Sequence, residues 1–88
     1  MRNGLDSATL AELFAWSAEE FGRRMAGSAI LRIGHERWLR NIAVALGNGL
    51  RAAGEEASRE ELRAALRARA DDASALVREH VAWALAQG

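Results

Sequence analysis

Two alanine- and leucine-rich segments, residues 38–46 and 76–85, share one order of residue types. Each has an apolar residue, then an arginine, then an apolar stripe that ends in Ala-Leu, if one residue is inserted in the second segment. The two segments begin about 38 residues apart, a period typical of stacked helical-pair repeats. We therefore predict two helices that lie side by side and bury their apolar flanks against each other.

The rest of the chain also favours helix, because Ala, Leu, Arg and Glu dominate and proline is absent. Serines followed three residues later by Glu, or opening an apolar stripe, predict helix N-caps at Ser17, Ser58 and Ser74. Glycine tolerates the backbone of a helix exit, so Gly27 and the run at 47–49 predict helix ends. The expected fold class is all-α, a short HEAT-like α-solenoid of four to five helices rather than a four-helix bundle.

We expect one compact domain with two parts. Residues 1–34 form a helical hairpin or bent helix, and residues 35–88 form HEAT-like helical repeats with helices over about 35–46, 58–70 and 75–86. The apolar stripes predict one core, and burying each large side chain contributes about 1.5–3 kcal/mol before entropy is counted. Its expected members are Trp38, Leu39, Ile42, Leu46, Leu62, Leu66, Val77, Val81 and Leu85.

Composition excludes several function classes. The 88 residues include no cysteine, which rules out disulfides, thiolate metal sites and cysteine nucleophiles. Twelve arginines balance twelve acidic residues, so net charge announces no nucleic-acid or membrane partner. The longest uncharged stretch, residues 41–50, is about half of the roughly 20 residues that a bilayer span needs. The first residues lack the apolar block of a secretion signal, so we expect a soluble, cytoplasmic protein.

Three segments, residues 27–34, 38–48 and 74–85, resemble the C-terminal HEAT-like repeat region of the epoxyqueuosine reductases. The family pattern reads roughly Gly-Ser/Thr-Pro-Ile, then Leu-Arg-Asn-x-Ala-x-Ala-Leu-Gly-Asn, then Pro-Leu-Val-Arg-Glu-His-x-x-Trp-Ala-Leu. The resemblance covers about residues 10–85. Ala29 and Ala75 stand where the family often has proline, and the loop at 50–58 looks longer and more charged than usual.

The resemblance implies an accessory role. In that family a cobalamin-binding domain and a ferredoxin-like domain with two [4Fe–4S] clusters lie upstream, and they reduce an epoxide on a tRNA anticodon base in the last step of queuosine formation. This chain has no cysteine to hold such clusters, so it resembles a non-catalytic C-terminal domain without cofactors of its own. The implied partners are tRNA and the upstream catalytic domains, with no membrane and no metal.

Five arginines are candidates for contact with RNA phosphates. Arg59, Arg63 and Arg67 recur every four residues and predict a basic stripe on one helix face, which could track a phosphate backbone. The alternative for the stripe is a solvated face, partly neutralised by neighbouring glutamates. Arg32 and Arg37 lie near a helix entry and are the other candidates. For Arg40 and Arg78 we favour structural bracing, with Arg78 bonded to the turn at 71–72.

The remaining candidates have structural interpretations. His80 is expected to be a packed, hydrogen-bonded histidine and His35 a helix-start residue, because neither has a metal-ligand partner at helical spacing. Trp38 and Trp83 fit a core or a repeat interface, and Trp16 is the tryptophan expected to be exposed. The alternative function is a helical-repeat scaffold for protein partners, which an apolar largest exposed patch would favour. An independent enzyme is the least favoured, since no acid, base and nucleophile come together.

Overall fold

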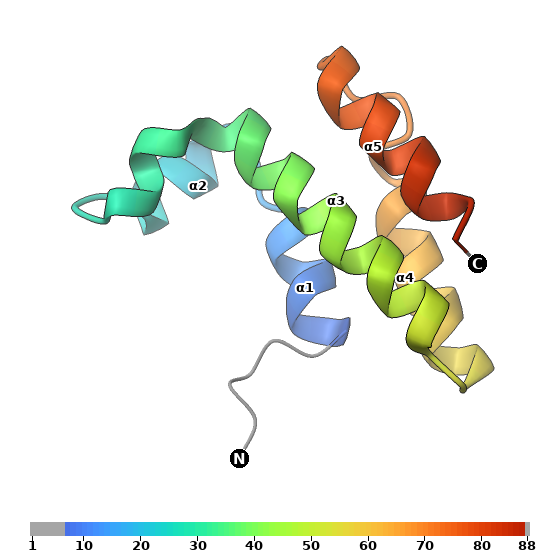
Figure 1. The fold of residues 1–88 in the computed structure, drawn as a ribbon. Coiled ribbons are helices and arrows are strands. Elements are labelled where there is room, and N and C mark those ends of the chain that lie inside the picture. Colours follow the sequence, from blue (N-terminus) through green and yellow to red (C-terminus); the bar gives the residue numbers. More distant parts are fainter. Residues whose placement is uncertain (1–6, 88) are drawn as a thin grey trace.

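The computed structural model describes residues 7–87, and this part of the chain is all-α, as predicted (Figure 1). Five α-helices and one 3-10 helix follow one another, and no strand occurs among the described residues. Their bounds are α1 (Ser7–Phe14), α2 (Ala18–Arg24), η1 (Ala29–Ile33), α3 (Gly34–Ala52), α4 (Glu56–Arg67) and α5 (Ala75–Leu85).

The long helix α3 organises the molecule. It packs most extensively against α5, and the two helices run in the same direction (Figure 1). Two contacts agree with this parallel arrangement. The hydroxyl of Ser74 donates to the carboxylate of Glu36 near the start of both helices, and Gly47 lies against Ala84 further along. Helix α1 packs against α3 and α4, and α4 also contacts α3 and α5. The predicted contact between the segments 38–46 and 76–85 is therefore confirmed.

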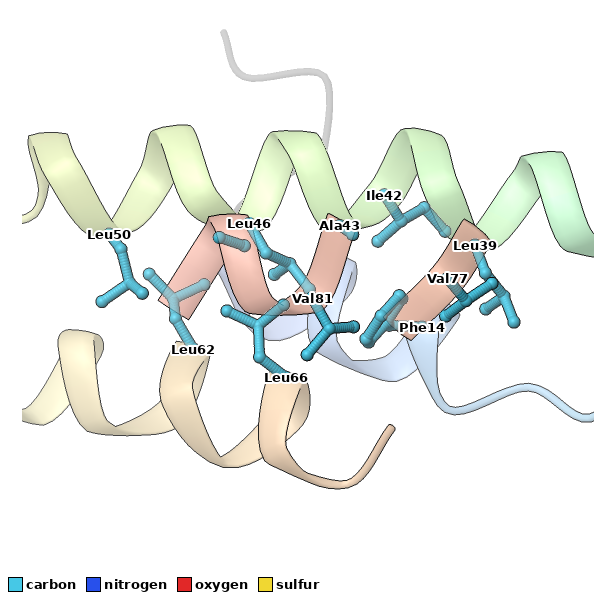
Figure 2. Close-up of a cluster of buried hydrophobic side chains, with 11 residues drawn as sticks. Phe14, Leu39, Ile42, Ala43, Leu46, Leu50, Leu62, Leu66, Val77 and Val81 are labelled. Carbon is cyan, nitrogen blue, oxygen red and sulfur yellow. The ribbon is translucent and has the colours of Figure 1, made fainter. Parts of the chain in front are cut away.

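One apolar core joins α1, α3, α4 and α5 (Figure 2). Most of the predicted core residues are buried in it, but Trp38 and Leu85 are only partly buried at its edge. Sequence analysis left out Phe14 and Leu50, which are both fully buried. The buried members are Phe14, Leu39, Ile42, Ala43, Leu46, Leu50, Leu62, Leu66, Val77, Val81 and Ala84.

The predicted helix ends are partly right. Ser17 and Ser74 are N-caps, since their hydroxyl oxygens accept from the amides of Glu20 and Val77. Gly27 has the positive φ, 82°, of a left-handed stop after α2. The predicted start at Ser58 is wrong, because α4 begins two residues earlier.

The predicted end of a helix at 47–49 is also wrong. Helix α3 continues to Ala52, and both Gly47 and Leu50 are buried along it. Continuing the helix keeps α3 packed against α5 and α4, and the hydrogen bonds and burial of that extra turn outweigh the poor helix propensity of two glycines.

An aromatic cluster holds α2 and the loop before it against the beginning of α3. The rings of Trp16 and Trp38 stack with centroids 5.8 Å apart, and Phe21 lies 5.3 Å from Trp38. The ring of His35 lies 5.6 Å from Phe21, and its Nε2 is 2.9 Å from the carbonyl oxygen of Trp16. Side chains of α2 and of the loop before it thus fix this part of the chain to side chains of α3.

Candidate functional site

The basic stripe predicted on α4 is matched by glutamates on the same face. Arg63 Nη1 lies 3.1 Å from Glu56 Oε2 and 3.3 Å from Glu60 Oε1, and Arg67 Nη1 lies 3.2 Å from Glu60 Oε2. The hydrogen bond from Arg67 lowers the pKa of the Glu60 carboxyl, and the hydrogen bond to Glu56 raises the pKa of Arg63. The stripe is therefore a network of exposed ion pairs, which leaves less positive charge for a phosphate backbone.

Arg59, the first residue of that stripe, faces the end of α3. Its Nη1 donates to the carbonyl oxygen of Leu50 at 3.1 Å, and its Nε lies 3.8 Å from Glu56 Oε1. Carbonyl groups in the last turn of a helix have no partner within the helix, and a guanidinium satisfies them while complementing the helix dipole. The geometry gives Arg59 a contact inside the fold.

Arg32 and Arg37 have a different setting at the η1–α3 junction. Both side chains are exposed. Among the arginines in residues 7–87, they alone make no hydrogen bond or ion pair with another described residue. Their charge is available to a ligand without breaking an existing contact.

The residues expected to brace the fold make local contacts. Arg78 Nη1 donates to the carbonyl oxygen of Asp72 at 2.6 Å, which ties α5 to the turn that precedes it. Arg40 Nε donates to the side chain of its neighbour Asn41 at 2.9 Å. His80 is half-buried, and its Nδ1 lies 2.8 Å from the carbonyl oxygen of Leu76, one turn earlier.

Arg69, which was not among the residues expected to be functional or structural, makes the longest-range side-chain hydrogen bonds among the described residues 7–87. Its Nε donates to the carbonyl oxygen of Phe14 at 2.6 Å, and its Nη2 donates to that of Trp16 at 2.7 Å. Its Nη1 pairs with Asp72 Oδ2 at 2.8 Å. Only the i, i+3 spacing from Arg69 to Asp72 is a signal in the sequence. This arginine joins the end of α1 to the turn between α4 and α5.

Apolar side chains gather on η1. Ile30, Leu31 and Ile33 are 41%, 39% and 42% exposed, and with Trp83 at 40% they are the exposed large apolar residues of the described chain. A hollow of about 480 Å³ beside them is lined by Gly27, Ser28, Ala29, Leu31 and Arg32. An apolar surface with one arginine thus lies where α2 turns into α3. Trp16, expected to be exposed, is half-buried under the stack with Trp38.

The described residues also limit other chemistry. No three His, Asp or Glu side chains among them gather as a group that could hold a metal ion. Within residues 7–87, no helix is long and apolar enough to cross a membrane.

Comparison with curated proteins gives the chain its relatives. It is 64% identical over 87 residues to an epoxyqueuosine reductase of Alicycliphilus denitrificans, and 65% identical over 91 aligned positions to one of Burkholderia pseudomallei. The chain is homologous to a part of the epoxyqueuosine reductases. The relative from Escherichia coli is 50% identical over 86 residues. These alignments include 97–99% of this chain but only 21–24% of each relative.

Two other comparisons add no further relative. No protein-family model matches the chain, and no solved structure matches it. The chain spans about a fifth of the length of the epoxyqueuosine reductases it matches. Because it contains no cysteine, its residues do not fit a cysteine-ligated [4Fe–4S] cluster, and we derive no chemical step through such a group.

Proposed function

We propose that this chain is a non-catalytic accessory segment of an epoxyqueuosine-reductase-like protein of the cytoplasm, and that it braces the remainder of that protein through η1. The homology supports the first part, because the matched relatives are four to five times longer than the matched segment. The surface of η1 carries the second part. Cobalamin and iron–sulfur clusters, which the family resemblance implies, would belong to that remainder.

The exposure of η1 is the observation on which the bracing role rests. Three large aliphatic side chains lie within four residues, and each is about two-fifths exposed. Exposed apolar side chains grouped in this way mark a protein interaction surface, either for the remainder of the same protein or, in the scaffold alternative, for a separate protein. The aromatic cluster of Trp16, Phe21 and Trp38 holds α2 against α3, and η1 lies between these two helices in the chain, so both ends of the surface are positioned before a partner binds.

A binding experiment with a shortened relative tests the bracing role. The epoxyqueuosine reductase of A. denitrificans is produced without the matched segment, and its association with the 88-residue chain is measured by calorimetry. We expect association, and Leu31→Asp should weaken it at least about tenfold, since it places a charge in the apolar contact. Ala57→Asp, at an exposed position of α4, is the control that should leave affinity unchanged.

Two outcomes would contradict the bracing role. One is the absence of association, which would favour the alternative of a helical-repeat scaffold for a separate protein. The other is equal binding by the Leu31→Asp and wild-type chains, which would place the contact elsewhere. Circular dichroism of each variant confirms that the helices are retained.

We further propose that the same edge contacts tRNA through Arg32 and Arg37. The observation that favours this second role is their exposure without an ion pair to any described residue, in contrast to the paired arginines of α4. Such contacts supply affinity through charge with little reading of the bases. Binding should therefore be weak and fall steeply as salt increases.

Titration of labelled tRNA at several salt concentrations tests this role. The Arg32→Ala/Arg37→Ala chain should lose affinity, and the slope of log K against log salt should shrink by about two, one for each phosphate contact removed. Arg63→Ala/Arg67→Ala removes equal charge from the paired stripe and should change the slope less. Failure of the wild-type chain to bind tRNA at low salt would remove the RNA role.

The helix packing supports a HEAT-like interpretation, which we retain as a proposal, but with α1 added to the repeats expected at residues 35–88. Helices α1 and α3 would form one helical pair, α4 and α5 the next, with α2 and η1 inserted in the first. This arrangement explains why α3 packs on α5 and α1 packs on α4.

A further inference from the structure

A second surface, away from η1 in the sequence, combines an aromatic ring with hydrogen-bond acceptors. A hollow of about 390 Å³ between α3 and α5 is lined by Val44, Glu79, His80 and Trp83. Val44 belongs to α3, and the other three residues belong to α5. None of these residues takes part in the contact of η1 with the remainder of the protein or in the tRNA contacts proposed above.

The ring of Trp83 is fixed on one side and open on the other. A Cβ atom added at Gly47 would lie 2.7 Å from Trp83 Cζ3, so the indole rests directly on the backbone of α3. The same side chain belongs to a residue that is 40% exposed. Seating on a helix backbone limits the rotamers of the ring, and this gives the hollow a rigid apolar wall.

The polar groups of the hollow accept hydrogen bonds. His80 Nδ1 faces the carbonyl oxygen of Leu76 at 2.8 Å, and because a carbonyl only accepts, Nδ1 carries the proton. In the neutral ring, Nε2 is then an acceptor. Glu79 is exposed, and its carboxylate forms no hydrogen bond or ion pair with another described residue. With His80 neutral, the hollow thus offers two acceptors and a π-surface, and its lining holds no arginine or lysine side chain.

We propose that this hollow binds a guanidinium group, presented as an arginine side chain on the surface of a protein partner. A guanidinium is planar and can stack on an indole while its N–H groups donate to a carboxylate and to a further acceptor. Its charge is complementary to Glu79. A nucleotide could also stack on Trp83, but it would bring a phosphate toward an unpaired carboxylate, and this charge repulsion makes RNA the less suitable occupant.

The proposal is tested with N-acetyl-L-arginine amide and the isotopically labelled 88-residue chain. We expect the indole N–H signal of Trp83, assigned with Trp83→Phe, to shift saturably with a Kd on the order of a few millimolar, as befits one isolated side chain. The citrulline analogue has nearly the same shape without the charge, and it should bind much more weakly. Glu79→Gln should raise the Kd at least about fivefold, because a charge-assisted bond becomes a neutral one.

Controls make each outcome decisive. Glu19→Gln removes an equal charge from an exposed position on α2 and should leave the titration unchanged. The proposal is overturned if arginine and citrulline probes act alike, if Glu79→Gln has no effect, or if guanosine monophosphate shifts the Trp83 signal more strongly than the arginine probe does. These measurements do not involve η1, Arg32 or Arg37, so they can fail or succeed independently of the proposed function.

Discussion

Gly47 is the residue on which the packing of α3 against α5 most depends. A Cβ atom there would lie 2.7 Å from Trp83 Cζ3 and 2.9 Å from both Cα and Cβ of Ala84. The two Ala84 atoms belong to the buried side of α5 and cannot move without shifting that helix. The glycine therefore permits close approach of two helices, and it does not end one.

Replacing Gly47 by alanine should destabilise the chain. Alanine favours helix over glycine by about 1 kcal/mol, but overpacking at a helix contact costs about 1–3 kcal/mol. Gly22→Ala is the matched control, since it lies in α2 and an added Cβ there meets nothing within 4 Å. Urea denaturation followed by circular dichroism should show a loss for Gly47→Ala and a gain of up to about 1 kcal/mol for Gly22→Ala. A gain at both positions would show that α5 moves away at little cost.

Among the polar contacts, Arg69 is the residue whose hydrogen bonds connect the most distant parts of the described chain. Only 18% of its side chain is exposed, and it satisfies the carbonyl groups of Phe14 and Trp16 besides pairing with Asp72. Arg69→Met keeps the length of the side chain, and it should cost about 1.5–3 kcal/mol, the range for hydrogen bonds to a charged group.

Arg67→Met is the control for that substitution, because Arg67 is 56% exposed and its ion pair with Glu60 is on the surface. Surface pairs contribute about 0–1 kcal/mol. Thermal denaturation of the two variants measures the difference. If Arg67→Met were as damaging as Arg69→Met, the contacts to α1 would not be what Arg69 contributes.

The arginines of α4 and Arg69 differ in how far the spacing of residues in the sequence predicts their contacts. The recurrence of Arg59, Arg63 and Arg67 places them on one helix face, and the structure agrees. The same periodicity places Glu56 and Glu60 there, so the neutralised stripe follows from the sequence as well. The partners of Arg69 lie 53 and 55 residues away in the chain, and no local pattern encodes them.

At the scale of helices, the three serines predicted to be N-caps show where a local signal is sufficient. Ser17 and Ser74 follow turns and precede apolar stripes, and both cap their helices. Ser58 has the same Ser-x-x-Glu pattern as Ser17, yet it lies inside α4 with its hydroxyl 3.5 Å from Glu55 Oε1. The pattern is ambiguous there, because Glu55 and Glu56 can begin a helix too and favour its positive N-terminal end.

Ser74, which caps α5, and Ser58, which caps no helix, provide a matched pair of variants. Ser74→Ala removes the acceptor for the amide of Val77 and the contact with Glu36, and it should cost about 0.5–2 kcal/mol. Ser58→Ala removes no cap, and since alanine favours helix it should be neutral or slightly stabilising. Differential scanning calorimetry measures both. An equal loss at the two serines would contradict the start of α4 at Glu56.

At the scale of the whole molecule, the repeated segments predicted more than any single motif. Their period placed α3 beside α5, and that contact is the most extensive in the fold. The period says nothing of residues outside the two segments. The burial of Phe14 and the exposure of η1 therefore came only from the structure, since both depend on how α1 and α2 meet the other helices in space.

The shared core predicts that the four packed helices unfold together. Leu46 of α3 is fully buried in the cluster of Figure 2, which α3 shares with α1, α4 and α5. Leu46→Ala should cost about 2–5 kcal/mol, a large part of the stability expected of so small a domain. Leu31→Ala, on exposed η1, should change stability by no more than about 0.5 kcal/mol.

Two probes of the same denaturation test this cooperativity. Circular dichroism follows the helices, and the tryptophan fluorescence of a Trp83→Phe chain follows the stack of Trp16 on Trp38, which joins the loop between α1 and α2 to α3. Because Trp38 packs against the core as well as against Trp16, both signals should change at one urea concentration, and Leu46→Ala should lower that concentration for both. A fluorescence transition at lower urea, unaffected by Leu46→Ala, would mean that α2 and η1 detach before the core unfolds. A segment that detaches first could not hold η1 in a fixed position for docking.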